Sequence, residues 1–122
     1  LIYVICLYII QGYAKHFKNI YSLRIENKKI NGLYDTGNNT NYLNVPIVYL
    51  SQSLYSELFL YVTDIEISTV NNISKIAIYQ GPKIVIDKKS LNVYYAFCNI
   101  DTKEYQAILP NNIFDSSHNI TK

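Results

Sequence analysis

The feature that most constrains the fold of this 122-residue chain is a strand-like segment that runs directly into the triplet Asp35-Thr36-Gly37. Upstream, apolar and polar residues alternate from residue 19 to residue 26, Asn27-Lys28 suits a tight turn, and residues 29–34 return as a second strand. Asp35 is therefore expected just after the second strand of a β-hairpin. The loop that it opens is polar and continues to Asn38.

A carboxylate in such a loop indicates amide hydrolysis by a pair of aspartates. Two carboxyl groups that share one proton hold a water molecule, and one acts as a base while the other acts as an acid, as in aspartic proteases. Asp35 is the candidate catalytic residue. Thr36 is small, and its hydroxyl can bond across a dimer axis. Gly37 permits a turn with positive φ and a close approach of substrate, and Asn38 tolerates turn conformations and can bond nearby backbone.

The triplet occurs once, in a chain too short for two lobes of this kind. One chain would then supply one carboxylate, so a homodimer is needed to complete the pair. The competing interpretation is ordinary turn chemistry, in which the aspartate caps a loop and the glycine turns it. The strand pattern directly before Asp35 favours the catalytic interpretation.

A family resemblance is carried by the run Tyr21-Ser-Leu-Arg-Ile-Glu-Asn-Lys-Lys-Ile-Asn-Gly-Leu-Tyr-Asp-Thr-Gly-Asn38. It resembles the start of the peptidase domain of the sporulation sigma-E factor processing peptidase, a family of membrane-anchored aspartic peptidases from endospore-forming bacteria. Residues 104–110 are similar to the closing segment of that domain, and residues 46–49 fit the strand after its active-site loop. Residues 51–83 match poorly and look abbreviated.

The resemblance implies a mostly β, retroviral-protease-like lobe that pairs as a homodimer. It implies an aspartic endopeptidase that cleaves the propeptide of an inactive sporulation sigma factor at the cell membrane, with the peptidase domain on the cytoplasmic side. The expected partners are the pro-sigma factor as protein substrate, a second copy of the chain, the membrane through the upstream segment, and an activating protein. No metal, cofactor or direct contact with nucleic acid is expected.

Two other interpretations remain open. One is a catalytically silent β domain that keeps the loop for dimerisation and binds a partner at the membrane. The other is a structural β domain in which the triplet is coincidental.

Composition agrees with one small globular domain. Apolar residues make up 49% of the chain, which is enough for a core and unlike a disordered segment. The net charge of +2 comes with scattered lysines, and no basic stripe indicates nucleic-acid binding. Cys6 and Cys98 lack metal-ligand spacing, and no disulfide is expected in a reducing cytosol.

The N-terminal residues 1–10 are wholly apolar and are followed by Lys15 and Lys18. Ten residues are too few to cross a bilayer as a helix. A buried strand, a strand at a dimer interface and the end of a transmembrane helix are the three interpretations, and the resemblance favours the third. The expected division is the end of a membrane anchor or a juxtamembrane segment at 1–18, an aspartic peptidase-like β domain at 19–114, and a polar tail at 115–122.

Downstream of the loop the pattern remains β-like. Strands are expected at 45–50, 64–70, 76–79, 83–87 and 91–100, and residues 54–62 fit either a short helix or a strand. Residues 103–109 are expected as the one short C-terminal helix, ended by Pro110.

Two features depart from the family pattern. Aspartic peptidases of this fold place a glycine after an apolar pair in a late strand that crosses behind the active-site loop, and the corresponding place here holds Cys98. The short middle region leaves Gln80-Gly81-Pro82 as the only tip-like turn for a substrate-covering flap.

Overall fold

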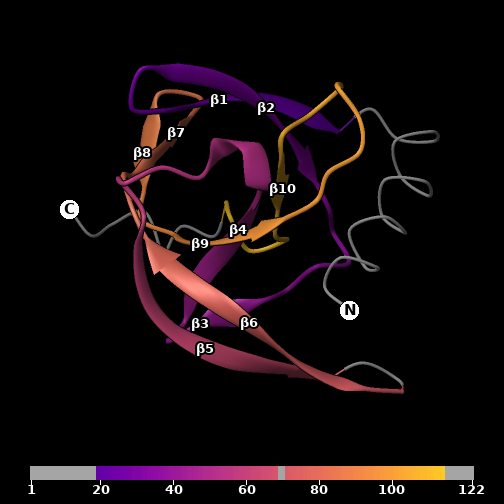
Figure 1. Ribbon diagram of the computed structural model, residues 1–122. Coiled ribbons are helices and arrows are strands. Elements are labelled where there is room, and N and C mark those ends of the chain that lie inside the picture. The colour runs from indigo at the N-terminus through magenta and orange to yellow at the C-terminus, as the bar shows by residue number, and fades with distance from the viewer. Residues whose placement is uncertain (1–18, 69–70, 115–122) are drawn as a thin grey trace.

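The computed structural model describes residues 19–68 and 71–114, and this part of the chain has a mostly β fold (Figure 1). Its helical content is one 3-10 turn, η1 (Gln52–Leu54). The strands are β1 (Ile20–Ile25), β2 (Lys28–Tyr34), β3 (Asn41–Tyr42), β4 (Val45–Ser51), β5 (Leu60–Ser68), β6 (Ile73–Gln80), β7 (Ile84–Ile86), β8 (Lys89–Leu91), β9 (Tyr94–Cys98) and β10 (Ala107–Leu109).

Several expectations fall on parts of the chain outside the described residues. These are the membrane-anchor segment at 1–18, Cys6 within it, and the polar tail at 115–122. Among the described residues, none of the helical structure is long and apolar enough to cross a membrane.

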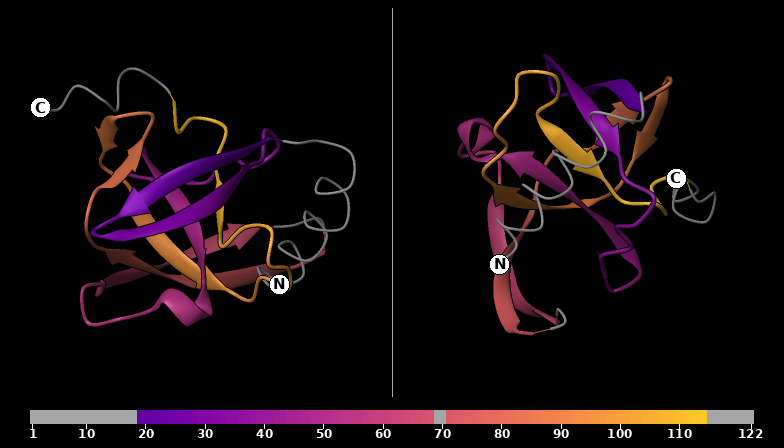
Figure 2. Two further views of the ribbon diagram at one scale, coloured as in Figure 1. Left: turned by 90° about the horizontal axis from the view of Figure 1, so that it is seen from above. Right: turned by 90° about the vertical axis from the view of Figure 1, so that its right-hand side faces the viewer.

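The strands form one mixed sheet in the order β5-β6-β9-β4-β10-β2-β1-β7-β8, and β3 pairs with β4 at the side. The pairs β4–β9 and β2–β10 are parallel. The sheet bends so that the β1–β2 hairpin and the β5–β6 hairpin lie at opposite ends of the described structure (Figures 1 and 2). The parallel pairing of β2 with β10 brings the C-terminal ends of both strands together, where the Asp35 loop begins.

Alternation along the central strands produces two apolar clusters, one on each face of the sheet. In β4, Val48 and Leu50 belong to one cluster, while Ile47 and Tyr49 belong to the other. Both faces of this strand are therefore buried, which explains its continuous apolar run. The prediction of a strand at 45–50 is confirmed.

The predicted β1–β2 hairpin is confirmed, with its turn shifted by one residue. Glu26 and Asn27 form the turn, because Ile25 pairs directly with Lys28. Glu26 has φ 56°, in the left-handed region that two-residue hairpin turns require. The alternating burial of β1 agrees with the sequence pattern.

The predicted C-terminal helix at 103–109 is wrong. Ala107, Ile108 and Leu109 form β10 instead, inserted between β2 and β4, and all three are fully buried. The ladders to both neighbouring strands satisfy the backbone polar groups of this buried segment. Three apolar residues carry too little periodicity to distinguish a helix from a strand.

Strands β5 and β6 form a long hairpin that projects from the rest of the sheet (Figures 1 and 2). Its pairing runs from Leu60 with Gln80 to Ser68 with Ile73, and one irregularity interrupts it. Ser68 and Ile73 are the last pair at the free end of this hairpin. The expectation that Gln80-Gly81-Pro82 is the only tip-like turn is wrong, since that segment joins β6 to β7.

Candidate active-site loop

Asp35 begins the loop that connects β2 to β3. Its backbone N–H donates to the carbonyl of Leu109 at 3.0 Å, so the loop starts as a continuation of the β2–β10 ladder. Its carbonyl accepts from the N–H of Asn38 at 3.1 Å, which closes a turn over residues 35–38. Only 2% of Asp35 is exposed, and it is the only charged residue in the buried set of the described structure.

The environment of the Asp35 carboxylate favours its protonated form. Burial raises the pKa of Asp35, while a hydrogen bond from the Gly37 N–H to Asp35 Oδ1, at 3.0 Å, lowers it by a smaller amount. Within the described part of the chain, burial and this hydrogen bond are the two influences on the pKa of Asp35. A carboxyl group with a raised pKa can hold or release a proton nearer to neutral pH, as acid–base chemistry requires.

The structure brings the four predicted residues into one turn. Thr36 and Gly37 are exposed, and Asn38 is half-buried. Asn38 Oδ1 accepts from the N–H and the hydroxyl of Thr40, at 3.1 and 2.6 Å, which confirms its expected bonding to nearby backbone. The expected positive φ of Gly37 is wrong, because no described glycine has one. The side chain of Asp35 closes the turn onto Gly37 without left-handed backbone.

Asn111 is a residue of this region that the sequence patterns did not indicate. Its N–H donates to the Asn38 carbonyl at 2.7 Å, and its side-chain Nδ2 donates to the Thr36 carbonyl at 3.1 Å. Its own carbonyl accepts from the Tyr34 hydroxyl at 3.0 Å. Asn111 thus contacts the chain on both sides of Asp35. The missing signal was the pairing of β10 with β2, which places the residues after Leu109 beside the loop.

The strand that crosses behind the loop is β10, and the expectation that placed Cys98 there is wrong. Cys98 ends β9 and pairs with Ser51 at the far end of β4. The apolar pair beside the loop is Ile108-Leu109, and Pro110 follows it. A buried proline, with its fixed φ and no N–H, therefore stands where the pattern expects a glycine.

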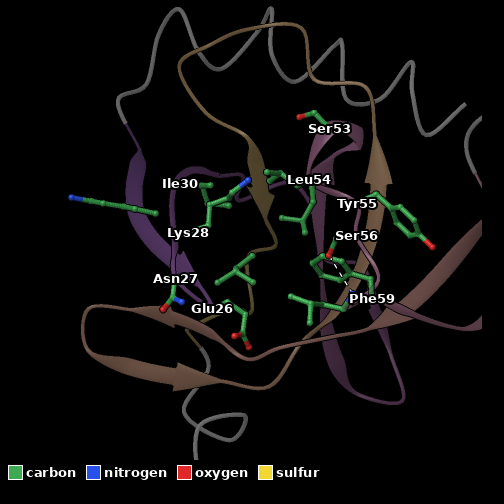
Figure 3. A pocket seen from close by; sticks show the side chains of 13 residues that line it. Glu26, Asn27, Lys28, Ile30, Ser53, Leu54, Tyr55, Ser56 and Phe59 are labelled. Atoms are coloured by element: carbon green, nitrogen blue, oxygen red, sulfur yellow. Dashed lines mark hydrogen bonds between the residues drawn. The ribbon is translucent and has the colours of Figure 1, made fainter.

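A separate hollow of about 720 Å³ lies at the opposite end of β2 (Figure 3). Lys28 and Ile30 come from the β1–β2 hairpin on one side, and Leu54, Tyr55 and Phe59 from the facing segment on the other. The complete lining is Ile25, Glu26, Asn27, Lys28, Lys29, Ile30, Leu50, Ser53, Leu54, Tyr55, Ser56, Leu58 and Phe59. The hollow is not part of the Asp35 loop, because it lies where β2 starts and the loop begins where β2 ends.

Within the described ranges, no group of three or more His, Cys, Asp and Glu side chains could hold a metal ion. No protein-family model matches the chain, and no curated protein matches it. A functional assignment therefore depends on the geometry of the loop.

Proposed function

We propose that this chain is an aspartic endopeptidase whose active site forms between two copies, each contributing Asp35. The observation that supports this most strongly is a buried aspartate with a raised pKa, in an Asp-Thr-Gly turn at the end of β2, where β2 pairs in parallel with β10. Burying an isolated carboxyl group is unfavourable, and carboxyl groups with a raised pKa are concentrated at functional sites.

The need for a second chain follows from the surroundings of Asp35. No other carboxylate affects its pKa within the described residues, and a lone carboxyl group cannot act as acid and base together. Thr36 and Gly37 are exposed and therefore available for a facing chain.

The β5–β6 hairpin supplies a further element of the proposed enzyme. It projects from the sheet and has exposed apolar side chains near both ends, among them Leu60 and Ile73. We assign it the role of covering an extended protein substrate at the dimer site. An extended peptide can pair with exposed strand backbone, while alternate side chains provide selectivity.

The sequence resemblance adds a fold type, a substrate and a location to this proposed function. The lobe would be retroviral-protease-like and homodimeric, and its substrate would be the propeptide of a sporulation sigma factor. The upstream residues would place it at the cell membrane with the peptidase on the cytoplasmic side, where an activating protein could reach it.

The direct test is cleavage of a purified pro-sigma factor by the purified chain, with fragments identified by mass spectrometry. Asp35→Asn keeps the shape of the side chain and removes its charge, and we expect the rate to fall by at least about 10²–10⁴-fold. Asp101→Asn is the matched control, because Asp101 is an exposed carboxylate outside both the loop and the β5–β6 hairpin. Cleavage by Asp35→Asn near the wild-type rate would exclude this enzyme class for the chain.

The alternative is a catalytically silent domain that binds a partner at the membrane. The hollow beside the β1–β2 hairpin favours it, because its volume is typical of ligand sites and its surroundings include exposed Tyr55 and Leu58. Equal partner binding by wild type and Asp35→Asn, together with no cleavage by either, would select this alternative.

A further inference from the structure

Asn111 and the Asp35 carboxylate are connected through a single peptide group. Asn111 Nδ2 donates to the carbonyl oxygen of Thr36 at 3.1 Å. The N–H at the other end of the same peptide group is that of Gly37, which donates to Asp35 Oδ1 at 3.0 Å. Because a peptide group is planar, holding its oxygen also fixes the direction of its N–H.

We propose that Asn111 is a positioning residue that orients the Asp35 carboxylate through the Thr36–Gly37 peptide group. Donation to the Thr36 carbonyl polarises the peptide and strengthens its N–H as a donor. The hydrogen bond from Gly37 in turn selects one orientation of the carboxylate. The hydrogen-bonded link from Asn111 to Asp35 does not depend on the function of the chain. Its consequence for catalysis rests on the proposed function.

Asn111 is well placed for this role because its backbone is itself fixed. Its N–H bonds the carbonyl of Asn38 at 2.7 Å, and its carbonyl accepts from the hydroxyl of Tyr34 at 3.0 Å. The side chain therefore extends from an anchored point. The orientation of its amide follows from chemistry, because the carbonyl of Thr36 can only accept and the NH₂ group must face it.

Few other groups can interfere with the titration of Asp35. The strands next to the loop are β2, β3, β4 and β10. Their titratable residues are Tyr34, Tyr42, Tyr49, Lys28 and Lys29. None of these five residues carries a carboxyl group, and the two lysines lie at the far end of β2. A change in the acidic range therefore reports on Asp35 and on a facing Asp35 in a dimer.

The test is a ¹³C NMR titration of the Asp35 carboxyl carbon in the full chain. Asn111→Ala should shift its midpoint to higher pH, since the Gly37 hydrogen bond that favours the ionised form is weakened. Asn111→Leu keeps the approximate size of the side chain and removes the donor without adding a charge, and it should shift the midpoint in the same direction. Asn41→Ala is the matched control, because the exposed Asn41 amide also donates to a loop carbonyl, that of Asn39 at 3.3 Å.

The inference is overturned if both Asn111 variants fold and their Asp35 midpoints equal that of wild type, or if Asn41→Ala shifts the midpoint equally. In a cleavage assay, Asn111→Ala should lower kcat about tenfold and move the acid limb to higher pH, with KM little changed. A purely structural role would lower the folded fraction without moving that limb. A shifted midpoint in a chain that cleaves nothing supports the positioning role and rejects the proposed function. If the midpoint is unshifted and the chain does cleave its substrate, the positioning role is rejected and the proposed function is supported.

Discussion

The N–H of Asp35 donates to the carbonyl of Leu109 at 3.0 Å, although the two residues come from opposite ends of the described chain. This bond continues the parallel pairing of β2 with β10 into the loop. The position of the candidate carboxylate therefore depends on a strand formed late in the sequence. Substitutions that disturb β10 should therefore displace the Asp35 loop as well as destabilise the fold.

Asp35 is expected to weaken the fold at neutral pH. Burial raises its pKa, so the folded chain binds this proton more tightly than the unfolded chain does. The free energy of unfolding therefore falls as pH rises from the unfolded pKa through the folded pKa, and it stays lower above both. Asparagine cannot ionise, and its Oδ1 can still accept from Gly37. Asp35→Asn should raise the free energy of unfolding at pH 7 by about 0.5–2 kcal/mol.

Urea denaturation at a series of pH values measures this effect. The advantage of Asp35→Asn should vanish below about pH 3, where the wild-type carboxyl group is protonated in both states. Asp101→Asn provides the control and should change stability by less than about 0.5 kcal/mol, as is usual for exposed positions. A variant Asp35→Asn less stable than wild type at pH 7 would show that the hydrogen bond from Gly37 outweighs burial.

Gly32 is expected to tolerate no side chain. It lies in β2 between β1 and β10, and an added Cβ would be 2.7 Å from Leu23 Cδ2 and 3.1 Å from Leu109 Cγ. Gly32→Ala should therefore lower the free energy of unfolding by about 1–3 kcal/mol, measured by thermal or urea denaturation. Since Leu109 must move, the variant should also reduce cleavage beyond its effect on the folded fraction.

Gly81→Ala is the comparison for this prediction. Its Cβ would lie 2.6 Å from Phe59 Cδ1, so it should destabilise the fold similarly. The neighbours of Gly81 are Phe59 and Tyr95 and not Leu109, so Gly81→Ala tests the destabilisation without disturbing β10. An unchanged melting temperature in Gly32→Ala would contradict the tight packing of β2 against Leu23 and Leu109.

The hairpin before Asp35 could be predicted because its signal is local. A period of two over residues 19–34, with a short polar turn, specifies two antiparallel strands without information from elsewhere. The turn chemistry of Asp35 and Asn38 is local in the same way, since each side chain bonds backbone two residues ahead. These parts of the fold and of the candidate site follow from neighbouring residues.

β10 and Asn111 could not be predicted, because their structure depends on distant partners. The segment Ala107–Leu109 has no periodicity of its own, and it is a strand because β2 and β4 lie on either side. Asn111 acquires its contacts only after β10 has formed. The free end of the β5–β6 hairpin could not be predicted either, because Gln80-Gly81-Pro82 is a stronger local turn signal than the residues that join its strands.

The pH dependence of cleavage should be bell-shaped. The proposed pair works with one proton, so kcat should fall at low pH as a second proton binds and at high pH as the shared proton is lost. Burial raises the pKa of Asp35 in the single chain, but the two limbs belong to the pair and to neither residue alone. Initial rates across pH 3–9, with stability checked at each pH, provide the measurement. A rate that rises steadily to pH 9, or inhibition by a metal chelator, would indicate another mechanism.

Activity should belong to the dimer, because a single chain supplies one Asp35. Specific activity of the purified chain should therefore fall on dilution, as dimers dissociate. Mixing gives a sharper test: wild type and Asp35→Asn are co-expressed in equal amounts, so that about one dimer in four keeps both carboxylates under random pairing. Activity should then be about a quarter of that of the same total amount of wild type, whereas a mixture with Asp101→Asn should keep nearly all of it. If the mixture with Asp35→Asn keeps half the activity, each chain works alone, and a second acid within the same chain must be sought.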